Sequence, residues 1–117
     1  MNTDTRTDDT DYSAKVRALN DAFRHTLTGG SVLMTASIMA LGSDLQTRIL
    51  AAVQSFEGFT TENDPWGEHD FGACEIDGEQ VFFKIDYFDP TRTWHSPDPA
   101  DQKVTHRVLT IMLAEDY

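Results

Sequence analysis

Two segments of the chain repeat their apolar residues at the spacing of an α-helix. The first stripe runs from Val16 to Leu27, with apolar residues every three or four positions, and it predicts one amphipathic helix. Asp11 or Ser13 can cap the start of this helix, because both side chains accept a hydrogen bond from a free backbone N–H. The glycine pair at 29–30 predicts its end, since glycine readily adopts the left-handed conformation found there.

A second amphipathic helix is predicted between Ser43 and Gly58. Its apolar stripe runs from Leu45 to Phe56, and Ser43 is a suitable capping residue. Between the two helices, residues 31–36 are mostly apolar and include β-branched side chains. This segment therefore predicts a short buried strand.

The clearest local signal is a β-hairpin centred on Asp77-Gly78. Strand-like runs at 71–76 and 79–88 flank this dipeptide, which favours a two-residue turn. A two-residue turn fixes which residues face each other across the hairpin. In this register His69 would lie opposite Asp86, on the face that points away from the core.

The same register assigns the two faces of the second hairpin strand. The odd-numbered residues from Val81 to Tyr87 are apolar or aromatic and would face the core, whereas Phe82 and Phe88 would face outward. The last segment, residues 104–114, is dense in valine, threonine, isoleucine and leucine. It predicts one more strand, with a helix as the alternative.

The predicted order is therefore helix, strand, helix and then three strands. This order predicts an α+β fold with a mostly antiparallel sheet of about four strands and two helices packed on one face. The chain has 117 residues, which fits one domain, here assigned to residues 12–117. Residues 1–11 are rich in threonine and aspartate and predict a disordered acidic tail.

The charge balance narrows the classes of partner. Twenty acidic residues against nine lysines and arginines give a formal net charge of -11. Such a chain repels phosphate, so we expect no direct binding to nucleic acid, and it attracts basic protein surfaces or cations. A single cysteine, no signal peptide and no apolar run of membrane-spanning length lead us to expect a cytoplasmic protein that does not bind membranes.

The acidic residues concentrate between residues 57 and 89, where ten acids accompany one basic residue, Lys84. Aromatic residues share this region, and acids around aromatic anchors are typical of a surface that binds a basic protein. We therefore predict a partner-binding site, no catalytic residue and no cofactor, and the exposed hairpin edge leaves a homodimer open as well. The predicted partner-binding residues are Asp64, Trp66, Glu68, His69, Asp70, Phe82, Asp86, Phe88 and Asp89.

Two other interpretations centre on His69 and Asp86. A carboxylate beside an imidazole raises its basicity and fixes its tautomer. With Glu68 and Asp64 nearby, the pair could bind a divalent metal and activate water, as in a metal-dependent hydrolase or metal-binding protein. No recognised ligand spacing such as His-Glu-x-x-His is present. The remaining interpretation is a structural ion pair that holds the preceding loop on the hairpin.

Three short sequence motifs resemble those of a known protein family. Gly67–Gly72 (GEHDFG), Lys84–Asp89 (KIDYFD) and Arg107–Ala114 (RVLTIMLA) resemble strings of a small bacterial domain family of unknown function, often found on plasmids and other mobile elements. The resemblance covers about residues 17–117 and implies a stand-alone protein of one domain. The family brings no established activity, so no residue role is carried over.

The mobile-element setting that the resemblance implies, together with the acidity, leads to a functional hypothesis. The protein would be a non-enzymatic inhibitor that presents carboxylates where a nucleic-acid-binding protein expects phosphates. Some anti-CRISPR and anti-restriction proteins act as nucleic-acid mimics in this way, and by analogy we extend that mode of action to this chain. We favour this interaction module over the metal-dependent alternative.

Overall fold

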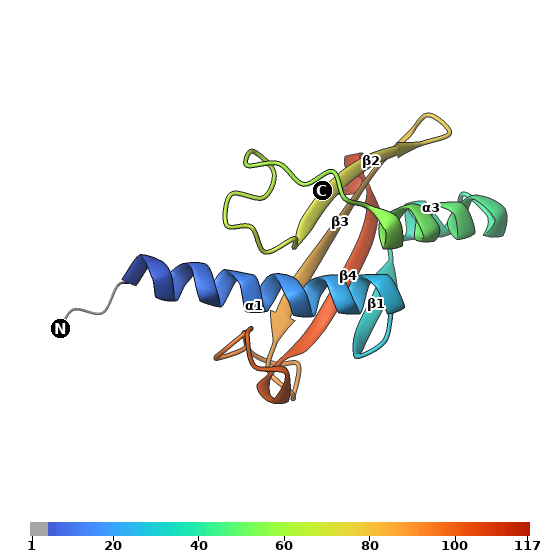
Figure 1. Ribbon diagram of the computed structural model, residues 1–117. Helices are drawn as coiled ribbons and strands as arrows, with labels where there is room; N and C mark the ends of the chain where they lie inside the picture. The colour runs from blue at the N-terminus through green and yellow to red at the C-terminus, as the bar shows by residue number, and fades with distance from the viewer. Residues whose placement is uncertain (1–4) are drawn as a thin grey trace.

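A four-stranded sheet in the order β1-β4-β3-β2 forms the centre of the molecule (Figure 1). The strands are β1 (Gly30–Met34), β2 (Phe71–Ile76), β3 (Glu79–Phe88) and β4 (His106–Leu113). Neighbouring strands are antiparallel except β1 and β4, which are parallel. The computed structural model describes residues 5–117, with side chains from residue 11 onward. The predicted α+β class and mostly antiparallel sheet are confirmed.

The helices α1 (Thr5–Thr26), α2 (Ala36–Met39) and α3 (Ser43–Ser55) share one apolar core with the sheet. In Figure 1, α1 crosses the strands, and the end of α1 packs beside α3. Two short 3-10 helices, Gln102–Val104 and Ala114–Asp116, flank β4. The buried core residues are Phe23, Ile38, Ile49, Val53, Val81, Phe83, Ile85, Leu109, Ile111 and Leu113.

The hairpin has the predicted register. Phe71 lies opposite Lys84 and Ile76 lies opposite Glu79, so Asp77 and Gly78 form the whole turn. Both turn residues have positive φ values, 51° and 82°, as a tight hairpin turn of this type requires. The odd-numbered residues of β3 face the core as predicted, and the last segment is the strand β4 rather than a helix.

Helix α1 begins earlier than predicted. It starts at Thr5 rather than near Asp11 or Ser13, because no glycine or proline interrupts the chain before residue 26. The C-terminal part of the expected disordered tail therefore lies in α1, and residues 1–4 lie outside the described residues. Despite its length, α1 is not apolar enough to cross a membrane, and neither is any other helix of the described chain.

The end of α1 also differs from the prediction. The helix ends at Thr26, and Leu27 takes the left-handed conformation, with φ of 59°, that was expected of the glycine pair. The N–H of Leu27 still donates to the carbonyl of Phe23, and its side chain packs against the core. This apolar contact offsets the backbone strain of a left-handed leucine.

Gly72 of β2 is a position where the core leaves no room for a side chain. An added Cβ would meet the ring of Phe83 and lie 2.8 Å from the ring of Phe56. We expect Gly72→Ala to lower the free energy of unfolding by about 1–3 kcal/mol, as measured by urea denaturation. Ala73→Ser changes the next, exposed position and should leave the midpoint nearly unchanged. Equal midpoints for both variants would contradict this packing.

Candidate functional site

His69 does not lie opposite Asp86, so the predicted cross-strand pair is wrong. Strand β2 begins at Phe71, and His69 has a positive φ of 58°. The alternation of strand faces therefore stops before His69, because it requires an extended backbone. Asp86 instead pairs with its strand neighbour Lys84, whose Nζ lies 3.1 Å from Asp86 Oδ2.

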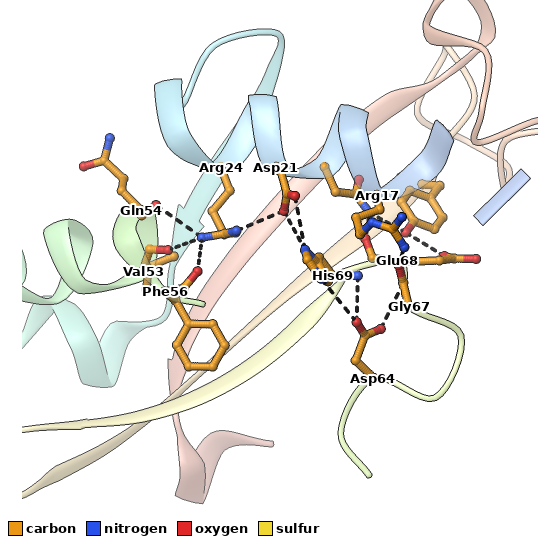
Figure 2. A network of polar contacts seen from close by, with 12 residues as sticks. Arg17, Asp21, Arg24, Val53, Gln54, Phe56, Asp64, Gly67, Glu68 and His69 are labelled. Carbon is orange, nitrogen blue, oxygen red and sulfur yellow. Dashed lines mark hydrogen bonds and ion pairs between the residues drawn. The ribbon is translucent and has the colours of Figure 1, made fainter. Parts of the chain in front are cut away.

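The left-handed turn directs His69 toward helix α1 (Figure 2). Its Nδ1 lies 2.9 Å from Asp21 Oδ1, and it donates that hydrogen bond because an ionised carboxylate only accepts. The imidazole also stacks on the ring of Phe59, with centroids 3.9 Å apart and planes 5° from parallel. His69 thus anchors the loop before β2 to the helix.

Asp64 is a buried acceptor in the same loop rather than a surface carboxylate. It is 7% exposed, and its two oxygens accept the backbone N–H groups of Glu68 at 3.0 Å and His69 at 3.1 Å (Figure 2). His69 Nε2 lies 3.9 Å from Asp64 Oδ2. Because these contacts occupy its oxygens, Asp64 fixes the turn that leads to His69.

A chain of four side chains links β4 to this loop through α1. The Nε of Arg107 donates to Asn20 Oδ1 at 2.7 Å, Asn20 Nδ2 donates to the hydroxyl of Tyr87 at 2.8 Å, and that hydroxyl donates to Glu68 Oε1 at 2.9 Å. Asn20 and Arg107 are fully buried. Each buried polar atom in this chain therefore has a partner, as burial requires.

A second buried arginine, Arg24, joins α1 to the end of α3 (Figure 2). Its guanidinium donates to the carbonyls of Val53 and Phe56, both at 2.9 Å, and pairs with Asp21 at 3.0 Å. Carbonyls at the end of a helix lack intrahelical partners. Arg24 thus caps α3, and Asp21 joins this cap to His69.

Burial changes the acidity of two carboxyls near the loop. It raises the pKa of Glu68, although the hydrogen bond from Tyr87 acts in the opposite direction. It also raises the pKa of Asp70, as do the neighbouring carboxylates of Asp64 and Asp86. Negative charge at these two positions is therefore unfavourable without a compensating cation.

A hollow of about 560 Å³ opens between β3 and the loop that precedes β2. A smaller hollow of about 310 Å³ adjoins it and shares Asp70, Ile85 and Asp86 with it. We call the two together the β3 hollow. Its acidic and aromatic lining residues are Glu62, Trp66, Asp70, Phe71, Asp86, Tyr87, Phe88, His95 and Tyr117.

The predicted partner-binding residues therefore fall into two groups, those in or beside the β3 hollow and those away from it. Trp66, Asp70, Asp86 and Phe88 line the β3 hollow, and Phe82 packs beside it in edge contact with Phe71 and Tyr117. Three others do not line it. Glu68 and His69 contact residues of α1, and Asp64 holds the turn that leads to His69.

Asp89 also lies outside the hollow. Its carboxylate accepts hydrogen bonds from the hydroxyl of Thr91 and from the backbone N–H groups of Thr93 and Trp94. These bonds fold the loop that follows β3. Like Asp64, Asp89 is an acid whose oxygens stabilise a turn.

A comparison with protein-family models identifies the family of this chain. The model of a family described as "Protein of unknown function (DUF3768)" matches residues 34–116. The chain belongs to the DUF3768 family. The expected membership in a family of unknown function is confirmed, over a shorter span than residues 17–117. No curated protein and no solved structure matches the chain.

The DUF3768 match includes β2, β3 and β4 but not α1. The loop that carries Asp64, Glu68 and His69 thus lies inside the match. The residues of α1 that hold this loop, Asn20 and Asp21, lie outside it. The candidate site of this DUF3768 protein is therefore positioned by a helix that precedes the matched span.

Sequence analysis missed the buried polar residues of α1, Asn20 and Arg24. The predicted apolar stripe from Val16 to Leu27 includes Leu19, which is only half-buried. A count of apolar residues cannot detect polar ones on a buried face. The available signal was their spacing, since Val16, Asn20 and Arg24 follow one another at intervals of four.

We expect loss of the Asp64 carboxylate to destabilise the protein. Asp64→Ala leaves the N–H groups of Glu68 and His69 without acceptors and should lower the free energy of unfolding by about 2 kcal/mol. Urea denaturation measures this change. Glu62→Ala, at an exposed position in the same loop, is the control and should have little effect. A similar small effect for both variants would show that Asp64 does not hold the turn.

The raised pKa of Glu68 predicts a pH dependence of stability. Above the ordinary value of 4.5, the unfolded chain releases a proton that the folded protein still binds, so this contribution to stability is lost as pH rises toward neutrality. Glu68→Gln keeps an acceptor for Tyr87 but cannot ionise. Its free energy of unfolding should therefore fall less than the wild-type value between pH 4.5 and neutral pH.

Urea denaturation at a series of pH values measures this difference. The exposed variant Glu62→Gln should follow the wild-type pH profile. Parallel profiles for Glu68→Gln and the wild type would contradict a raised pKa at Glu68.

Proposed function

We propose that this protein is a small acidic, non-enzymatic interaction module that binds a basic protein through the β3 hollow and its rim. The observation that carries the proposal is the composition of that hollow. Acids and aromatics, among them Asp86 and Trp66, line one concave surface at the edge of β3. Such a surface suits a partner that offers both positive charge and apolar contact.

The exposure of the aromatic residues supports this proposal. Trp66 is 77% exposed and Tyr117 is 76% exposed, although both side chains are large and mostly apolar. Phe71 and Phe82 lie against Tyr117 in edge contacts and extend the apolar surface. Exposed aromatic patches with a polar rim are typical of protein interaction sites.

The charge of the chain supports a basic partner. A net charge of -11 attracts positively charged proteins over distances near the Debye length and repels nucleic acid. Strongly basic surfaces are typical of proteins that bind nucleic acid. We therefore extend the proposal to an inhibitor of a nucleic-acid-binding protein, in the manner of anti-CRISPR or anti-restriction nucleic-acid mimics.

The structure offers less support for the metal-dependent alternative. That interpretation needed His69 and Asp86 in one place, and they have different partners. Within the described part of the chain, no group of three or more histidine, cysteine, aspartate or glutamate side chains is arranged to hold a metal ion. We therefore keep the interaction module as the proposed function.

The proposal predicts a partner that dissociates as salt rises. Immobilised protein is incubated with extract of the native host at low ionic strength and eluted with a salt gradient, and mass spectrometry identifies what elutes. We expect a basic, nucleic-acid-handling protein at moderate salt, because salt screens the attraction. Adding the acidic protein should then release nucleic acid from that partner in a gel-shift assay.

A matched pair of charge reversals locates the binding surface. Glu62 lines the β3 hollow, whereas Glu57 lines a separate pocket that includes Asp21 of α1 and His69. Both glutamates are exposed. Glu62→Lys should weaken binding of the partner by about fivefold or more, as measured by calorimetry, and Glu57→Lys should change it much less. Equal losses in both variants, or binding that resists salt, would contradict the proposed surface.

A further inference from the structure

We infer that the β3 hollow is a receptor for one cationic side chain, an arginine or lysine, of the partner protein. This inference rests on the proposed function and names the chemical group that the site recognises. It commits to a guanidinium or alkylammonium group that enters between the aromatic rings and reaches the carboxylates of Asp70 and Asp86.

The lining of the larger hollow matches such a group. Trp66, Phe71 and Tyr117 supply three aromatic rings, and Asp70 and Asp86 supply two carboxylates. An aromatic face attracts a cation through its quadrupole, and tryptophan does so most strongly. Carboxylates add direct charge and hydrogen-bond acceptors. Aromatic rings and carboxylates together favour an organic cation over a bare metal ion, for which the rings are poor ligands.

The chain itself already brings an alkylammonium group to this site. Lys84 lines the hollow, and its Nζ lies 3.1 Å from Asp86 Oδ2. The Lys84 and Asp86 side chains are 41% and 42% exposed. A half-exposed pair of this kind contributes little to stability, and the long lysine side chain can move into solvent. Lys84 thus shows that Asp86 accepts an ammonium group and identifies the group with which a ligand would compete.

The state of Asp70 supports the same ligand. Asp70 lines both parts of the hollow. Its carboxyl is partly removed from water and has Asp64 and Asp86 as neighbouring charges, and these effects raise its pKa. A cation placed between Asp70 and Asp86 would relieve that repulsion. The combined volumes of about 560 and 310 Å³ leave room for a long side chain and part of the backbone that carries it.

Tryptophan fluorescence provides a direct test. The chain has two tryptophans, Trp66 and Trp94, and only Trp66 lines the hollow. In a Trp94→Phe background, titration with N-acetyl-arginine amide should give a saturable change in Trp66 emission. N-acetyl-citrulline amide has nearly the same shape without the charge, and it should bind at least about fivefold more weakly.

Two substitutions in that background sharpen the test. Asp86→Asn removes one charge and should weaken arginine amide binding about fivefold or more. Lys84→Met removes the competing ammonium and should tighten it. Circular dichroism confirms that both variants are folded. Equal binding of the arginine and citrulline compounds, or weaker binding in Lys84→Met, would overturn the inference.

The outcomes for the hollow and for the proposed function can be separated. If a basic partner binds in a salt-sensitive way but arginine amide leaves Trp66 unchanged in every variant, the cation receptor is wrong and the interaction module stands. If arginine amide binds as expected but no basic partner is found, the receptor stands and the proposed function is wrong.

Discussion

Two buried arginines determine how the parts of this protein are joined. A guanidinium removed from water is costly unless its donors have acceptors, so the positions of those acceptors are constrained. Arg24 reaches the carbonyls at the end of α3 and the carboxylate of Asp21. Arg107 bonds Asn20, Gln102 and the carbonyl of Pro99. Helix α1 is therefore tied to α3 and to the segment before β4 by polar contacts inside the core.

The same helix positions the loop that borders the candidate site. Asn20 donates to the carbonyl of Glu68, and Arg17 donates to the carbonyl of Gly67. These bonds, together with the pair of Asp21 and His69, hold the loop beside α1 until Asp70. The chain enters β2 only at Phe71, which leaves the end of β3 after Lys84 without β2 as a paired strand. The β3 hollow lies at that end, and Tyr87, a member of the buried hydrogen-bond chain, also lines its smaller part.

Much of the fold could be predicted because its signals are local. The dipeptide at Asp77-Gly78 set the hairpin register, and the apolar residues of α3 and β4 marked elements that the structure confirms. The candidate site was harder, because one left-handed residue, His69, ended the alternation on which the prediction relied. Contacts such as that of Tyr117 with Phe71 depend on the order of strands in the sheet, which the local pattern does not contain. The polar residues Asn20 and Arg24 lie on a helix face that periodicity treats as apolar.

The burial of Arg24 and Arg107 also affects how the molecule meets copies of itself. Among the side chains from residue 11 onward, two cations and one carboxylate, that of Asp64, are withdrawn from the surface, so this part of the exterior is more negative than its composition suggests. Like-charged exteriors repel, and this colloidal repulsion keeps molecules apart in solution. A homodimer through the β3 hollow would have to bring two sets of carboxylates together. The burial of these two arginines therefore has a second effect. It leaves an acidic face that is better suited to bind a different protein than a second copy of this chain.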